Sequence, residues 1–143
     1  MSLMGWNKCE KEFIYHVEVD IERIKSITSI AENRISTISS LKEDEKSIPF
    51  MVEGYYEAIK ELLVVYLLAN GLRSKNHQCL FSYFYLKNKD KEHDTMLLTK
   101  LSYYRNRLNY YGESIPSSFY LKNKEDILNI VKTIKDLIKK QLS

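Results

Sequence analysis

The chain has 143 residues and a formal net charge of +3, and 44% of its residues are hydrophobic, while four are glycine and two are proline. So few glycines and prolines exclude an all-β sandwich, which needs a turn signal about every 8–12 residues. The longest wholly apolar run, residues 62–69, is too short to span a bilayer, and no secretory signal opens the chain. Composition therefore predicts one mostly helical, cytoplasmic domain without membrane contact.

The first half of the chain predicts two long helices. Apolar or small residues recur at alternating spacings of three and four between Ile14 and Ile38, which predicts one helix from about Asn7 to Ser40. The serines and threonines in its second half allow a kink or break there. Residues 41–47 are a polar connection, and Ser47 is a suitable N-cap for a second, central helix. This helix ends near Asn70, where the following glycine suits a left-handed C-terminal residue.

The second half predicts three further helices and no strand of useful length. They cover residues 77–86, then a stretch capped by Asp94 that stops at Gly112, then about 124–141. The expected fold is an all-α antiparallel bundle of four to five helices, formed by residues 7–143 as a single domain. We expect residues 1–6 to be disordered or left over from expression.

Residues that could bind metal or perform chemistry are sparse and scattered. Cys9 and Cys79 are too few for a disulfide framework or a metal cluster. The histidines His16, His77 and His93 fall on three different predicted elements. Glycine-rich phosphate loops are not found in the sequence. We therefore expect no metal site and no cofactor.

One segment, residues 103–112, concentrates arginines, amides and tyrosines at the end of a predicted helix. Arginine offers a planar donor fork suited to phosphate oxygens, and tyrosines can stack on bases. The alternative is structural, because cations near a helix C-terminus are also favoured by the helix dipole. The candidate binding residues for a nucleotide or RNA are Arg105, Asn106, Arg107, Asn109, Tyr110 and Tyr111.

The charge distribution bears on the same question. Residues 1–72 carry a net charge of −4, and residues 73–143 carry +7. A basic second half could steer a phosphate-bearing ligand, while a solvated lysine-rich surface is the alternative explanation.

Four segments of the chain together resemble a known family. These are residues 54–63, the Leu-Ala-Asn-Gly at 68–71, the Asn-His at 76–77 and the segment Arg105-Asn106-Arg107-Leu108-Asn109-Tyr110. The family that they resemble is the HEPN domain family (higher eukaryotes and prokaryotes nucleotide-binding). In that family a helix of the form Tyr-x-x-Ala-x-x-x-Leu ends at a glycine, and a short loop with a histidine then begins the next helix. Residues 105–110 fall where the family's Arg-Asn-x-x-x-His motif is expected. The resemblance covers roughly residues 8–140. It implies a helical bundle, a homodimer that joins two motifs in one cleft, and action on RNA, often as a toxin paired with a small nucleotidyltransferase antitoxin.

By this resemblance, Arg105 would hold phosphate and Asn106 would orient the site, but Tyr110 stands where the family has its catalytic histidine. A phenol with a pKa near 10 is a poor general base at neutral pH compared with imidazole. Arg105 and Tyr110 are the candidate catalytic residues, and binding without catalysis is favoured over cleavage. The alternatives are a metal-independent endoribonuclease and a helical protein-interaction module without a ligand site.

Overall fold

The computed structural model describes residues 3–143. This part of the chain forms six α-helices, a 3-10 turn at Lys89–Lys91 and two strands of three residues, so the expected all-α bundle is confirmed. The helices are α1 (Trp6–Glu12), α2 (Ile21–Ser39), α3 (Ile48–Ala69), α4 (His77–Lys87), α5 (Glu92–Tyr111) and α6 (Ser117–Leu142). The strands are β1 (Ile14–His16) and β2 (Leu72–Ser74).

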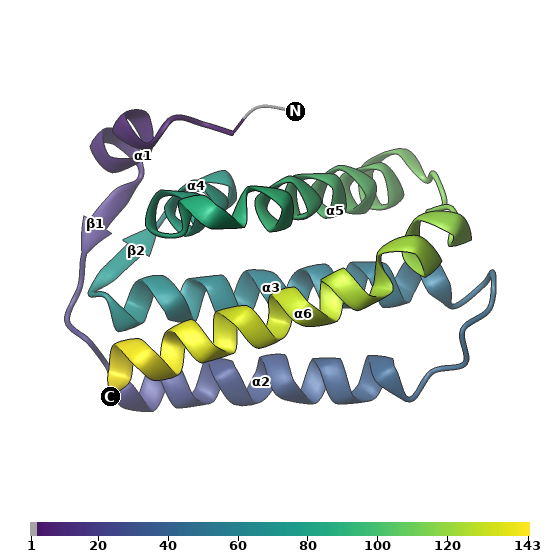
Figure 1. Cartoon of the computed structure of the whole chain (residues 1–143), viewed down its shortest axis with the longest axis horizontal. Coiled ribbons are helices and arrows are strands. Elements are labelled where there is room, and N and C mark those ends of the chain that lie inside the picture. Colours follow the sequence, from purple (N-terminus) through teal and green to yellow (C-terminus); the bar gives the residue numbers. More distant parts are fainter. Residues whose placement is uncertain (1–2) are drawn as a thin grey trace.

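Helix α3 forms the centre of the bundle (Figure 1). Helices α2 and α6 run along it, α4 and α5 lie across its other side, and α1 with the two strands closes one end. The sequence explains why α3 is central, because the second half of this helix carries apolar residues on nearly all of its faces. None of the helices among residues 3–143 is both long and apolar enough to cross a membrane.

The prediction of one helix from Asn7 to Ser40 is wrong, because the chain leaves the helical path over residues 13–20. Ile14 and Val17 fit a helical stripe, but they belong to a run of β-branched and aromatic residues that also favours extended backbone. Asp20 then starts α2 by accepting a hydrogen bond from the Arg23 backbone N–H at 3.1 Å. The bundle consequently has one helix more than expected.

The extended segment pairs with the loop after α3. Strands β1 and β2 are antiparallel, with Tyr15 opposite Arg73, and the Val17 N–H donates to the Gly71 carbonyl at 2.9 Å. The expectation that no strand forms is therefore also wrong. Gly71 has the predicted left-handed backbone, with φ of 72°, which turns the chain from α3 into β2.

Two other helix starts differ from those predicted. Helix α5 begins at Glu92, so that Asp94 lies in its first turn and does not cap it. Helix α6 begins at Ser117, well before Lys124, directly after Pro116. The added turns bury the ring of Tyr120 completely, which explains why the helix extends that far.

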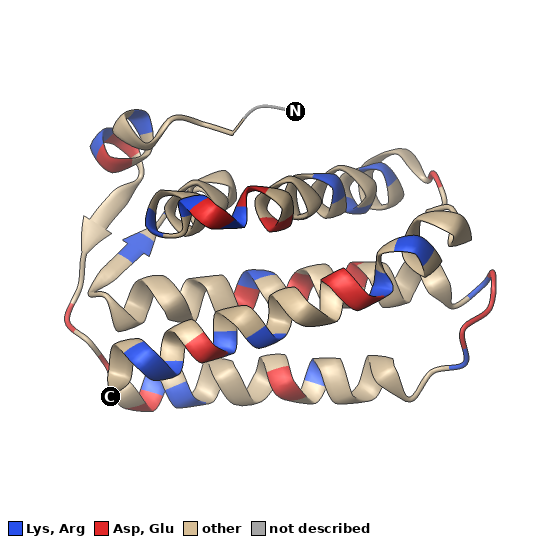
Figure 2. Cartoon of the chain, in the orientation of Figure 1, with Lys and Arg blue, Asp and Glu red and all other residues tan. Residues whose placement is uncertain are grey.

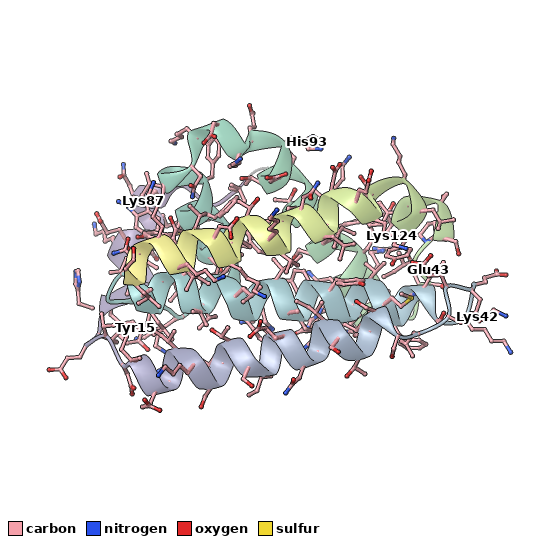
Figure 3. All side chains as sticks on the ribbon, turned by 60° about the horizontal axis from the view of Figure 1, so that its bottom comes forward. Tyr15, Lys42, Glu43, Lys87, His93 and Lys124 are labelled. Carbon is pink, nitrogen blue, oxygen red and sulfur yellow. A yellow bond between two sulfur atoms is a disulfide. The ribbon has the colours of Figure 1, made fainter. Side chains whose placement is uncertain are left out.

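Tyr120 also joins α6 to the loop between α2 and α3. Its hydroxyl donates to Glu43 Oε2 at 2.8 Å, and Lys124 contacts the same oxygen at 2.6 Å. Figure 3 shows Glu43 and Lys124 side by side where the loop meets α6. This cluster ties the first part of α6 to the α2–α3 loop through side chains that are distant in sequence.

The two cysteines are linked to each other, although two cysteines were too few to predict a disulfide framework. Cys9 of α1 and Cys79 of α4 are fully buried, with Cα atoms 5.6 Å apart, and form a disulfide. The preceding residues are also packed: Leu3 contacts the core, and Ser82 Oγ donates to the Met4 carbonyl at 2.6 Å. The first two residues of the start that was expected to be disordered lie outside the described part.

Candidate functional site

The candidate residues occupy the last two turns of α5, which stops at Gly112 as predicted; Gly112 has a left-handed φ of 65°. Helix α5 carries its acidic residues in the first turn and its arginines near the end (Figure 2). This order suits the helix dipole, which favours cations at the C-terminal end. Neither arginine lies in the last turn of α5, however, so the helix dipole gives only a weak structural reason for their position.

Arg105 points toward α3 and contacts Glu57. Its Nη2 lies 3.2 Å from Glu57 Oε1, and both side chains are about one-fifth exposed. Glu57 also binds Lys60 at 2.7 Å, so that two cations share one carboxylate. Such an ion pair is what a helical protein-interaction module without a ligand site would also show.

The guanidinium of Arg105 lies within reach of two tyrosine rings. The ring centres of Tyr56 and Tyr110 are 5.8 and 5.9 Å from its central carbon. Its Nη1 donates to Asn106 Oδ1 at 3.3 Å, whereas its buried Nε has no hydrogen-bond partner among the described residues. Arg105 thus has donor capacity that its protein neighbours do not use.

Two other arginines near the site are paired more completely. Arg34 binds Glu61 through both Nε and Nη2, at 3.0 and 3.2 Å. Arg107 binds Glu113 in the same two-pronged way, with Nε 2.8 Å from Oε2. Only Arg105 of these three meets its carboxylate through a single nitrogen, so its pairing with Glu57 is less complete than that of the other two arginines.

Arg107 lies on another face of α5 from Arg105. Its central carbon is 4.5 Å from the ring centre of Tyr111 and 5.9 Å from that of Tyr103. A groove of about 550 Å³ opens beside these residues, between α5 and the start of α4. Its lining includes Gln78, Ser102, Tyr103, Asn106, Arg107 and Tyr111.

The six candidates therefore do not form one cluster. Tyr110 stands with Arg105 beside α3, and Tyr111 stands with Arg107 in the groove. Asn106 contributes to both, because it contacts Arg105 and lines the groove. Asn109 is exposed and belongs to neither group.

The local charges shift the pKa values of three groups. Burial raises the pKa of Glu57, but Lys60 and Arg105 outweigh it, and the net pKa lies below the ordinary value. Burial lowers the pKa of Arg105, but the Tyr110 hydroxyl and Glu57 raise it by more, so the net pKa lies above the ordinary value. Burial, together with Lys60 and Arg105, lowers the pKa of His77. Arg105 is therefore a permanent cation and Glu57 a carboxylate at neutral pH.

His77 begins α4 but does not cap it. The cap is Asn76, whose Oδ1 accepts from the Gln78 N–H at 2.8 Å. The effect of Lys60 and Arg105 on its pKa places His77 in the electrostatic neighbourhood of the α3–α5 cluster. The sequence did not reveal that His77 lies near Arg105, because the two residues belong to different helices.

Several residues of this region were missed or misassigned from sequence. Glu57 and Glu61 recur with Glu53 at intervals of four, a spacing typical of a solvated helix face, yet both are half-buried in ion pairs. Tyr56 and Gln78 carried no signal, because their role depends on how α3, α4 and α5 meet. No group of three or more His, Cys, Asp or Glu side chains among residues 3–143 is placed to hold a metal ion.

Comparison of the chain with family models, with curated proteins and with solved structures found no match. Function must accordingly be argued from the arginines, tyrosines and groove at the end of α5.

Proposed function

We propose that this chain binds RNA or a nucleotide through its phosphate, with Arg105 as the main phosphate ligand. The observation that carries the proposal is the incomplete pairing of Arg105, set against the two-pronged pairing of Arg34 and Arg107. A phosphate offers the second and third acceptor oxygens that a guanidinium fork can engage. Arg105 and Lys60 both lie against Glu57, so two cations stand where such an anion would bind.

Binding without catalysis is the form of this proposal that the side chains support best. Tyr110 is 71% exposed and lies beside Arg105, where it can contact a ligand. A phenol is a weak base near neutral pH, so Tyr110 is suited to stacking or hydrogen bonding rather than to proton abstraction. Metal-independent RNA cleavage is the alternative enzymatic function.

The family resemblance supplies the wider context of the proposal. A HEPN-like protein would act as a cytoplasmic homodimer, and a nucleotidyltransferase-type protein would be its partner in a toxin–antitoxin pair. The helical bundle and the position of Arg105 and Asn106 on the fifth helix are compatible with that context.

The test is binding of a fluorescently labelled single-stranded RNA, measured by anisotropy at several salt concentrations. We expect affinity that falls as salt rises, because phosphate contacts release counterions. Replacing Arg105→Ala should weaken binding about tenfold or more, as expected for the loss of a charge-assisted hydrogen bond. Affinity that is equal for the wild type and Arg105→Ala would contradict the assignment.

The matched control is Arg23→Ala, which removes the same charge from an exposed site at the start of α2, at the opposite end of the bundle from the end of α5. It should change RNA affinity little. Arg105→Ala should stay folded, with a loss of stability of about 1 kcal/mol or less, because Glu57 keeps Lys60 and the pair is partly exposed. RNA incubated with chelator should remain intact, and products that disappear in Arg105→Ala would instead favour the endoribonuclease.

A helical interaction module is the second candidate, and the ion pairs Arg105–Glu57 and Arg107–Glu113 favour it. In that case the arginines only connect α5 to its surroundings. Undetectable RNA and nucleotide binding at low salt, with a protein that co-purifies, would support this function over the first.

A further inference from the structure

The groove between α4 and α5 differs chemically from the surface around Arg105. Its cation, Arg107, is already held by both oxygens of Glu113, so the groove has little charge to offer a phosphate. What it offers is neutral: the amides of Gln78 and Asn106, the hydroxyl of Ser102 and the rings of Tyr103 and Tyr111. Its volume of about 550 Å³ lies within the range of small-ligand sites.

These groups match the features of a nucleobase. Amide side chains present a donor and an acceptor side by side, as the edges of bases do. Tyrosine faces are stacking platforms for any base, because every base has a π-face. Tyr111 is 67% exposed and Tyr103 is 48% exposed, so each ring, although contacted by Arg107, leaves part of its surface to a ligand.

Asn106 connects the groove to Arg105. Its Oδ1 accepts from Arg105 Nη1, and the residue also lines the groove, while its NH₂ group is not used by Arg105. One residue thus orients the arginine and faces the groove. A phosphate on Arg105 and a base in the groove would lie on either side of Asn106.

We infer that the groove beside Tyr103, Asn106 and Tyr111 is a nucleobase subsite for the strand or nucleotide whose phosphate Arg105 binds. The inference rests on the proposed phosphate binding by Arg105 and adds a binding site for the base of the same ligand. Tyr111 stacks on the base, and the Asn106 and Gln78 amides contact its edge.

The test compares a short single-stranded RNA with an abasic sugar-phosphate strand of the same length. The wild type should bind the RNA about tenfold more tightly, because stacking of one base adds affinity of that order. Tyr111→Ala should bring the two affinities close together, while Arg105→Ala should weaken both. Tyr15→Ala, which removes a part-exposed tyrosine from β1 at the far end of the bundle, is the matched control and should preserve the difference.

A second variant separates the amide donor from the ring. Asn106→Asp keeps an acceptor for Arg105 but removes the NH₂ donor, so it should reduce the preference for RNA over the abasic strand. Tyr111 is exposed and Asn106 is half-buried, so we expect both variants to remain folded, which thermal unfolding would check.

The outcomes separate the two proposals. Equal wild-type affinities for RNA and abasic strand, both lowered by Arg105→Ala, would overturn the base subsite and keep phosphate binding. A preference for RNA that survives Tyr111→Ala and Asn106→Asp would also overturn the groove assignment. Failure of the wild type to bind either strand would overturn both.

Discussion

At Gly54, helix propensity and packing pull in opposite directions. Glycine inside a helix costs about 1 kcal/mol relative to alanine, so an alanine at this position of α3 would ordinarily stabilise the protein. A Cβ built at Gly54, however, would overlap Cδ1 of Ile38 and lie 2.8 Å from its Cγ1. The close packing of α2 on α3 at Ile38 thus explains why a glycine occupies this position.

Replacing Gly54→Ala should therefore lower the free energy of unfolding by about 1 kcal/mol, because overpacking outweighs the gain in propensity. Chemical denaturation measures the change. Combining it with Ile38→Val, which removes the overlapping methyl group, should recover part of the loss in a double-mutant cycle. Strict additivity of the two substitutions would show that the contact is not the cause.

At the scale of elements, the sequence predicts segments with a clear helical periodicity, whereas it does not predict segments whose structure depends on contacts with distant parts of the chain. Helix α3 follows from its apolar pattern, and the ends of α3 and α5 follow from Gly71 and Gly112. Residues 13–20 fit two periodicities, and the choice depends on pairing with β2, which lies far away in sequence. The segment at the end of α5 was found from its residue types, but its division between two faces required knowing where α3 and α4 lie.

The join between α6 and the loop before α3 makes stability depend on pH. Hydrogen bonds from Lys124 and Tyr120 lower the pKa of Glu43 below its ordinary value of 4.5. Burial and the bond to Glu43 raise the pKa of Tyr120, which therefore stays protonated as the donor. A carboxylate with a lowered pKa stabilises the fold above pH 4.5, and this contribution disappears as pH falls through the folded-state value.

Acidification from pH 6 to about pH 3 should therefore lower the melting temperature of the wild type more than that of Glu43→Gln. The glutamine still accepts the tyrosine hydroxyl but carries no titrating charge. Glu45→Gln removes a carboxylate from an exposed position of the same loop and should retain the wild-type slope. A Glu43→Gln variant with the wild-type pH dependence would show that this cluster does not couple the loop to α6.

At the scale of the whole molecule, the disulfide fixes the N-terminal segment to the bundle. Besides the covalent link, Trp6 packs on Tyr83 with ring centres 5.4 Å apart, and β1 pairs with β2. Disulfides are rare in the cytosol, where thiols are kept reduced. The proposed cytoplasmic location and the linked cysteines thus predict different redox states in the cell.

Reduction of the isolated protein should lower its free energy of unfolding by about 2–4 kcal/mol, because the bond joins residues separated by 70 positions and restricts the unfolded chain. Thermal unfolding with and without reductant measures this. The double variant Cys9→Ser, Cys79→Ser should be insensitive to reductant, and a wild type equally insensitive would mean that the cysteines are free in solution.

The same bond determines how the chain responds to a protease. The disulfide closes residues 9–79 into a covalent ring, and the exposed connection between α2 and α3, residues 40–47, lies inside it. A single cut in that connection would open the ring without separating the pieces, so α1, α2 and the rest of the bundle would remain one molecule. Reduction would then leave the N-terminal fragment held only by packing and strand pairing, so that the nicked, oxidised protein is a covalent heterodimer of its own two parts and the nicked, reduced protein is not.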